Sequence, residues 1–327
     1  MRGDGSNGAD GLSESGSMGY PGWFHDLASR VNNWGRWGDD DQLGTLNLLD
    51  EKARLRGIGA ARQGRAIALG LPLSAAEGVQ MGLIPGRINP LRTMVSVNKP
   101  DFGDPTIFCS SEDVVVMALQ CATHWDALAH VSYDGRMWNG YDPVEVVTAN
   151  GASTCSVEKA GTVVSRGVLL DVARARGEER LTGGHAITSD DLDRAQELAG
   201  VEVVAGDIVL VRTGQMAFLR KGRKMDYAFP SPGLSAQTVP WMRDRDVAAV
   251  ASDTLVGEVW PPEDEAAPLP VHCLHVVEMG MTQGQNWALD PLAEDCAADG
   301  QYDFLLEATP EPFTNAVGSP VNPVAIK

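Results

Sequence analysis

One stretch constrains this chain more than any other, and it runs from Leu119 to His130. It holds two of the six histidines and follows the apolar run 114–118, which predicts a buried strand. His124 and Asp126 are two residues apart, so both side chains point to one face in extended chain, whereas on a helix they would point about 200° apart. An extended segment lets both side chains close on one ion. We therefore predict that His124 and Asp126 are metal ligands.

His130 lies six residues after His124, which in extended chain is about 20 Å and too far for a shared coordination sphere. A bend after Asp126, built by a turn of helix over 125–129, would return it to the same cavity. We predict His130 as a neutral general base rather than a ligand. The alternative for the whole stretch is structural, because an isolated His-x-Asp pair is common in proteins that bind no metal.

The stretch resembles the His-x-Gly-Thr-His-x-Asp-x-Pro-x-His signature of the cyclase family. That family includes metal-dependent kynurenine formamidases, isatin hydrolases and trans-dienelactone hydrolases. Four residues match the signature: Thr123, His124, Asp126 and His130. Three depart from it: Gln120 replaces the first His, Ala122 replaces Gly and Leu128 replaces Pro. Without that first His, a two-zinc site of the formamidase kind is not expected, and Gln120 is a candidate for the substrate-binding surface.

Further blocks resemble the family, in its order, from about Trp34 to the C-terminus. They are Trp34–Asn47, Arg166–Asp171, Gly206–Gly214, Pro232–Ser235, Ser252–Thr254 and Gly318–Pro323. The resemblance implies the family's α/β swivelling fold, a mixed sheet or barrel-like core flanked by helices, in a homodimer or homotetramer. Residues 1–18 are rich in Gly, Ser and Asp and have little to bury, so we expect a disordered leader before one domain over 19–327.

A divalent ion needs more than two protein ligands, and the resemblance suggests where a third comes from. In one family block a His precedes a metal-binding Glu, and here His272 and Gln285 resemble those positions. An amide oxygen is a weaker ligand than a carboxylate. One nitrogen and two oxygens suit Mn²⁺ better than Zn²⁺, so we expect one divalent metal, Mn²⁺ first and Zn²⁺ second. His272 could ligate the metal, bind the substrate or be a buried structural histidine.

Cationic and aromatic side chains supply candidates for the substrate cavity. Arg87 or Arg92, in or beside a turn-rich loop, could hold a substrate carboxylate, although a loop arginine is more often solvated. Tryptophans would suit a flat or cyclic organic substrate, although Trp is as often plain packing. The candidates are Trp37, Trp125, Trp138 and Trp287.

These residues together predict a reaction. A bound metal lowers the pKa of its water toward about 7 and polarises a carbonyl, which is the chemistry of amide and lactone opening. His130, with an ordinary pKa near about 6.5, can take the water's proton and deliver it to the leaving group. We predict a metal-dependent hydrolase of a cyclic amide, imide or lactone, or of an aryl formamide. The alternatives are a non-hydrolytic cyclase, dehydratase or isomerase of secondary metabolism and a binding protein that has lost catalysis.

Composition excludes other classes of function. The net charge is −18 with a pI near 4.6, so nucleic acid and anionic membrane surfaces are not expected partners. No apolar run approaches the roughly 18 residues that a transmembrane helix requires. Five cysteines without Cys-x-x-Cys spacing and no signal peptide predict reduced thiols in the cytoplasm.

Overall fold

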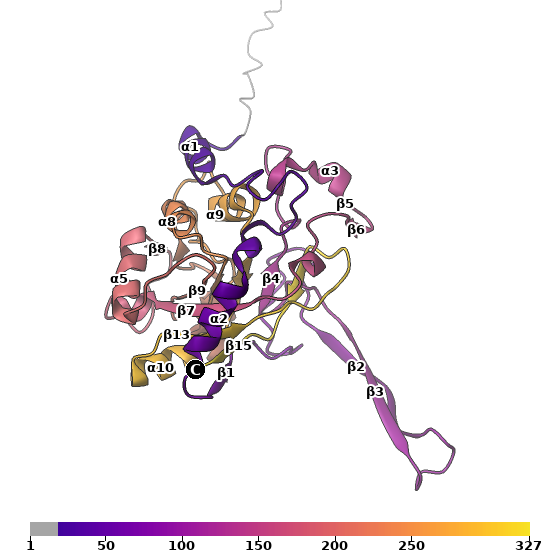
Figure 1. Ribbon diagram of the computed structural model, residues 1–327. Coiled ribbons are helices and arrows are strands. Elements are labelled where there is room, and N and C mark those ends of the chain that lie inside the picture. Colours follow the sequence, from indigo (N-terminus) through magenta and orange to yellow (C-terminus); the bar gives the residue numbers. More distant parts are fainter. Residues whose placement is uncertain (1–18) are drawn as a thin grey trace, which may run out of the picture.

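A curled mixed sheet forms the centre of the computed structural model, which describes residues 19–327 (Figure 1). From one edge to the other its nine strands are β1 (Ala66–Ala68), β15 (Val324–Ile326), β13 (Asp303–Glu307), β7 (Val164–Asp171), β9 (Ile208–Arg212), β11 (Ala249–Ser252), β12 (Gln283–Gln285), β4 (His124–Asp126) and β14 (Gly318–Pro320). Strands β7, β9, β11 and β12 run parallel, and the flanking pairs are antiparallel. The expected α/β fold with a curled mixed sheet flanked by helices is confirmed, whereas the expected leader over 1–18 lies outside the described residues.

Alternate residues of the central strands fill two separate cores. Val168 and Leu170 of β7 pack with α1 (Gly22–Val31), α5 (Ser189–Ala199) and α8 (Val239–Asp244). Leu169 packs on the opposite face, with Leu292 of α10 (Asp290–Asp299). Because these strands are buried on both faces, their sequences are continuous apolar runs rather than alternating ones.

Local chemistry defines where the helices begin. The Asp50 side chain accepts a hydrogen bond from Ala53 N at the start of α2 (Glu51–Ala60), and Thr188 forms a reciprocal capping box with Asp191 in α5. The other helical segments are α3 (Pro143–Val146), α4 (Val172–Ala175), α6 (Met216–Arg220), α7 (Lys224–Ala228), α9 (Pro270–His272) and the π-helix η5 (Cys273–Met279), with 3₁₀ turns η1 (Gly44–Leu48), η2 (Trp138–Gly140), η3 (Val157–Ala160) and η4 (Ala236–Thr238). Two small strand pairs lie outside the central sheet: β5 (Val147–Thr148) with β6 (Gly151–Ala152), and β8 (Ala186–Ile187) with β10 (Gly233–Leu234).

A long hairpin, which we call the arm (residues 91–116), projects from the body (Figure 1). It consists of β2 (Leu91–Pro100) paired with β3 (Cys109–Val116). The prediction of a buried strand over 114–118 is wrong, because Val114 is 47% exposed and Val116 is 60% exposed. An apolar run shows that side chains favour burial, but it does not show which surface covers them.

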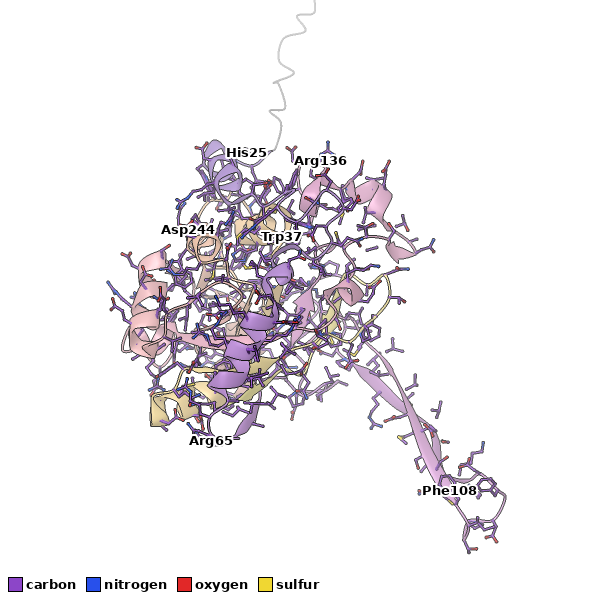
Figure 2. The ribbon with its side chains drawn as sticks, viewed as in Figure 1. His25, Trp37, Arg65, Phe108, Arg136 and Asp244 are labelled. Carbon is purple, nitrogen blue, oxygen red and sulfur yellow. The ribbon has the colours of Figure 1, made fainter. Side chains whose placement is uncertain are left out.

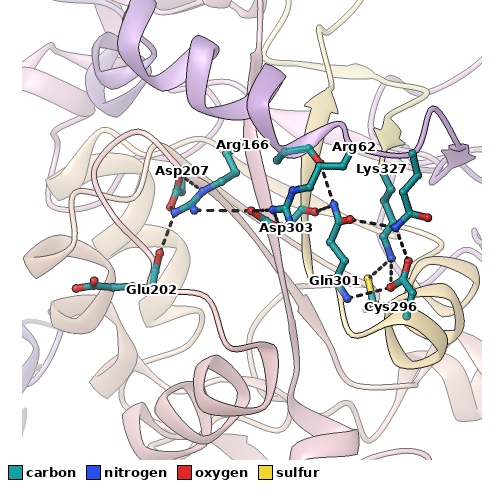
Figure 3. Close-up of polar contacts among 11 residues, drawn as sticks. Arg62, Arg166, Glu202, Asp207, Cys296, Gln301, Asp303 and Lys327 are labelled. Carbon is teal, nitrogen blue, oxygen red and sulfur yellow. Dashed lines mark hydrogen bonds and ion pairs between the residues drawn. The ribbon is translucent and has the colours of Figure 1, made fainter.

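Ion pairs anchor the C-terminal strand at the other end of the sheet (Figure 3). Lys327 is fully buried, and its Nζ lies 2.7 Å from an Asp295 oxygen and 2.8 Å from an Asp299 oxygen. Arg62 binds Asp303 at 2.6 Å in the same region. The Lys327 contacts hold the end of β15 against α10. The motif strand β4 lies near the opposite edge of the sheet. Within residues 19–327 no helix has the length and apolar character needed to cross a membrane.

Candidate active site

Strand β4 carries the central motif and is held on both sides. It pairs antiparallel with β12 and β14, and His124 faces Gln285 across the first of these ladders. His124 and Asp126 are buried and lie on one face of β4, as predicted from their spacing. Trp125 points the other way, where its ring lies 4.9 Å from that of Trp287 and its Nε1 donates to Ala308 O. One face of β4 therefore carries the candidate metal ligands His124 and Asp126, and the other face packs in the core through Trp125.

The His124 and Asp126 side chains meet in an arrangement that calls for a cation. His124 Nδ1 lies 2.7 Å from the carbonyl oxygen of Ala122, so this nitrogen carries the proton and Nε2 carries a lone pair. Nε2 in turn lies 3.4 Å from Asp126 Oδ1, and both atoms are buried without a hydrogen-bond partner. Two buried lone pairs that face each other are unfavourable unless a positive charge joins them. The pair therefore fits a metal ion.

Gln285 adds a third donor to this pair. Its Nε2 donates to Asp126 Oδ2 at 2.9 Å, which leaves its amide oxygen buried and without a partner. Among residues 19–327 no three His, Cys, Asp or Glu side chains are grouped so that they could hold a metal. An ion at β4 would therefore depend on this amide oxygen as well as on the imidazole and the carboxylate.

The chain bends after Asp126 and returns His130 to the same place. His130 N donates to Ala127 O at 2.9 Å in a tight turn, and His130 Nε2 lies 3.6 Å from Asp126 Oδ1. The Asp126 carboxylate raises the pKa of His130, but burial and nearby cationic groups lower it by more, so it lies below its ordinary value. Burial alone would raise the pKa of Asp126, and its three histidine neighbours hold it well below the usual range.

A cavity of about 490 Å³ opens above these groups. Its polar end is formed by Asp126, His130, Gln285, His272 and Arg87. Its walls are largely apolar and include Tyr20, Ile84, Phe229, Leu255, Val256, Trp260 and Leu269. A cavity with a few converging polar groups and apolar walls is the usual form of a small-molecule site.

His272 reaches the cavity from α9 with one nitrogen already occupied. Its Nδ1 is in close hydrogen-bond contact with Glu258 Oε1, and this carboxylate also accepts from the backbone N–H groups of Val271 and His272. Burial lowers the pKa of His272, but Glu258, helped by Asp126, raises it by more. Because Nδ1 is engaged, only Nε2 is available to a molecule in the cavity.

Arg87 lines the same cavity, whereas Arg92 does not. Burial lowers the pKa of Arg87, and the Asp126 carboxylate raises it by less. No carboxylate of the described chain forms an ion pair with Arg87, so its guanidinium is available to an anionic group. Arg92 instead lies on the arm, where it pairs with Asp113 at 3.3 Å.

The remaining predicted site residues do not line the cavity. Trp125, Trp138 and Trp287 are fully buried core side chains, and Trp37 is half-buried with its ring 6.3 Å from that of Trp138. Gln120 packs beside Gly318 of β14. Packing therefore accounts for all four tryptophans.

Sequence reasoning missed the residues that shape the cavity around His272. Glu258 lies fourteen positions before it, and Trp260 and Phe229 form part of the wall with rings 6.2 Å apart. Glu258 could have been suspected as an acidic residue in the apolar region that follows β11. Neither Trp260 nor Phe229 belongs to a pattern that distinguishes it from other aromatic residues.

Comparisons with known proteins identify the family. A family model described as a cyclase matches residues 46–259, which are 214 of the 327 residues. The chain belongs to the cyclase family. A crystal structure described as a novel cyclase is 32% identical, with a TM-score of 0.83 over 92% of this chain and 99% of that chain. A search of curated proteins found no match.

More distant members share the fold. Isatin hydrolase A from Labrenzia aggregata is 20% identical, with a TM-score of 0.59 over 80% of this chain and 93% of that one. An isatin hydrolase bound to the product analogue thioisatinate is 18% identical, with a TM-score of 0.58 over 84% of this chain and 98% of that one. The scaffold is therefore one that also occurs in hydrolases.

Proposed function

We propose that this protein is a metal-dependent hydrolase that opens a cyclic amide, imide or lactone, or cleaves an aryl formamide. The observation that carries the proposal is the set of three buried polar atoms without partners: His124 Nε2, Asp126 Oδ1 and Gln285 Oε1. They come from β4 and β12, and two of the three residues line the cavity. Isatin hydrolases of the same fold act on a cyclic compound, as their name states, and this supports a cyclic substrate.

One divalent ion would be held by His124, Asp126 and Gln285, with Mn²⁺ favoured over Zn²⁺ because two of the three donors are oxygens. When bound, such an ion polarises a carbonyl and makes water acidic enough to react near neutral pH. The His124 tautomer suits metal binding. Its protonated Nδ1 donates to Ala122 O, which leaves the lone pair of Nε2 available to the ion.

His130 is the general base of the proposed reaction. Its Nε2 lies 3.6 Å from Asp126 Oδ1, so His130 lies beside the candidate metal ligands. The proposed three ligands do not include it. It would take a proton from water and deliver it to the nitrogen or oxygen of the broken bond. Geometry within the cavity supports this assignment independently of the metal's identity.

His272 and Arg87 orient the substrate. His272 Nε2 can donate to a carbonyl or leaving group because Glu258 engages the other ring nitrogen. Arg87 can bind a carboxylate or a second carbonyl of the substrate or product. The apolar walls, with Trp260 and Phe229, suit a flat ring and exclude water from it.

The test is a screen of cyclic amides, imides, lactones and aryl formamides in ¹⁸O-labelled water. Hydrolysis predicts one ¹⁸O atom in the new carboxylate for at least one substrate, and His130→Gln should abolish most of that product. A product that forms without ¹⁸O would contradict hydrolysis and favour a cyclase, dehydratase or isomerase.

A further inference from the structure

The segment before α1 reaches the cavity of the candidate active site. Tyr20 lines this cavity, although α1 itself lies at the outer surface of the body, where Figure 2 labels His25. The candidate metal ligands come from β4 and β12, far along the chain. Tyr20 therefore brings a separate segment to the same cavity.

The side chain of Tyr20 is held in one position. Its hydroxyl donates to Pro268 O at 2.6 Å, and its ring stacks on that of the buried Phe24 with ring centres 4.1 Å apart. The ring of Tyr133 meets it edge to face at 5.5 Å. Burial, with a smaller effect from a neighbouring thiol, raises the pKa of Tyr20 far above its ordinary value, so the hydroxyl stays protonated as a donor. Tyr20 is therefore a fixed wall of the cavity.

The same segment fastens the loop 261–269, which contributes Pro268 to the cavity lining. Trp23 Nε1 donates to Asp264 Oδ2 at 2.9 Å, and the other oxygen of this carboxylate accepts from a backbone N–H of the loop. In the part of the chain that the structure describes, the hydrogen bonds that reach this loop from distant segments are those of Tyr20 and Trp23. Two adjoining parts of the wall are thus held together.

This wall lies beside His272. The Tyr20 hydroxyl is 3.2 Å from Cys273 Sγ, and Cys273 directly follows His272 in the chain and is 4% exposed. The cavity volume of about 490 Å³ is in the lower half of the range of about 300–1,000 Å³ that is usual for ligand sites. A cavity of this size, closed by a fixed aromatic ring, suits a compact molecule.

We infer that Tyr20 is a specificity-determining residue, which restricts the substrate to a compact ring system without a bulky substituent on the side that His272 contacts. The inference rests on the proposed function for the reacting ring, but the wall itself does not depend on it. A single methylene in an apolar pocket changes kcat/KM by about 10- to 200-fold, so the loss of an aromatic ring should change the preference for substrate size by at least as much.

The first test measures whether the Tyr20 ring covers the Cys273 thiol. Burial raises the pKa of this thiol to about 12, so its alkylation by iodoacetamide is slow and is compared as a rate at one pH. Tyr20→Ala should raise the alkylation rate of Cys273 at least about 10-fold above that of Tyr20→Phe, because the thiol gains access to the reagent. Tyr20→Phe is the matched control, since it removes the same hydroxyl and keeps the ring.

The other cysteines report on the fold of each variant. Cys109 is exposed and should react alike in every variant. The buried thiols of Cys121, Cys155 and Cys296 should stay unreactive as long as the variant is folded. Mass spectrometry of the digested protein assigns the label to each cysteine. A gain at Cys273 alone therefore measures access to the cavity rather than unfolding.

The second test compares substrate sizes, using the smallest substrate that the screen turns over and its phenyl-substituted derivatives. The unmodified chain should prefer the parent compound, and Tyr20→Ala should shift the ratio of kcat/KM values toward one derivative by about 10- to 200-fold. Tyr20→Phe should keep the preference for the parent compound. So should Asp26→Ala, a change at an exposed position of α1. A merely structural role of Tyr20 would lower turnover of all compounds alike and leave the ratio unchanged.

The two tests fail in different ways. An unchanged ratio in Tyr20→Ala, or equal alkylation of Cys273 in Tyr20→Ala and Tyr20→Phe, would overturn the assignment of Tyr20. A screen in which no compound is turned over would contradict the proposed function instead. The alkylation rates would then decide alone whether Tyr20 closes the cavity.

Discussion

At the scale of single residues, the spacing of His124 and Asp126 predicted correctly that both side chains share one face of a strand. It could not predict the His124 tautomer, because that depends on a backbone carbonyl at Ala122 whose direction is set by the local turn. Nor could it find Glu258, because a loop brings this carboxylate to His272 from fourteen residues away. Contacts between residues that are close in the sequence can be predicted from their spacing. Contacts between distant segments can be predicted only once the fold is known.

Proton transfer should be separable from metal binding. His130→Gln is expected to keep the bound ion and to lose about 10²- to 10⁴-fold in turnover, the usual contribution of a positioned acid or base. Elemental analysis and steady-state kinetics on the same preparation measure both quantities. A variant that loses its metal would make His130 a ligand, and normal turnover would remove it from the mechanism.

A buried histidine outside the cavity should make the fold sensitive to acid. Burial lowers the pKa of His275 to about 3, while the unfolded chain has the ordinary value of about 6.5. Below pH 6.5 the unfolded state therefore binds a proton that the native state does not, and stability falls by about 1.4 kcal/mol per pH unit.

Between pH 7 and pH 5 this loss amounts to about 2 kcal/mol in the free energy of unfolding. His275→Gln should remove that part of the loss, so its stability should fall less steeply in urea titrations at the two pH values. Parallel curves for the two proteins would show that His275 does not cause the effect.

At the scale of elements, the central strands β7, β9 and β11 are continuous apolar runs because both of their faces are covered. The same kind of run led to a wrong prediction at 114–118, because Val114, Val115 and Val116 belong to the exposed arm. The tryptophans were ambiguous for a related reason: Trp125 and His124 are adjacent in sequence but point to opposite faces of β4. An apolar pattern predicts that a segment is buried. Which face of a strand packs in the core and which faces the site depends on how the elements pack together.

Close packing of α2 on β7 gives a prediction with an internal control. A Cβ added at Gly57 would lie 2.6 Å from a backbone carbon of Ser165, whereas one at Gly59 would meet nothing within 4 Å. Gly57→Ala should therefore destabilise the protein by about 1–3 kcal/mol through overpacking. Gly59→Ala should be neutral or stabilise it by up to about 1 kcal/mol, because Ala favours a helix. Equal effects of the two substitutions in chemical denaturation would contradict this packing.

At the scale of the whole molecule, the order of the family-like blocks along the sequence was sufficient to predict the architecture. The sheet brings β4 and β12 together although they are more than 150 residues apart, and this pairing assembles His124, Asp126 and Gln285. The arm is the large feature that the sequence did not predict. Its apolar side chains are exposed, and no pattern in the sequence distinguishes them from apolar side chains that are buried.

The most direct test of the account is the metal content of the purified protein and of Asp126→Ala. After chelation and titration with Mn²⁺, the unmodified chain should bind one ion per copy, with binding measured calorimetrically. Asp126→Ala should bind none at the same concentration while keeping its circular dichroism and thermal transition. Full occupancy in Asp126→Ala, or no binding by the unmodified chain of either Mn²⁺ or Zn²⁺, would contradict a metal centre at β4.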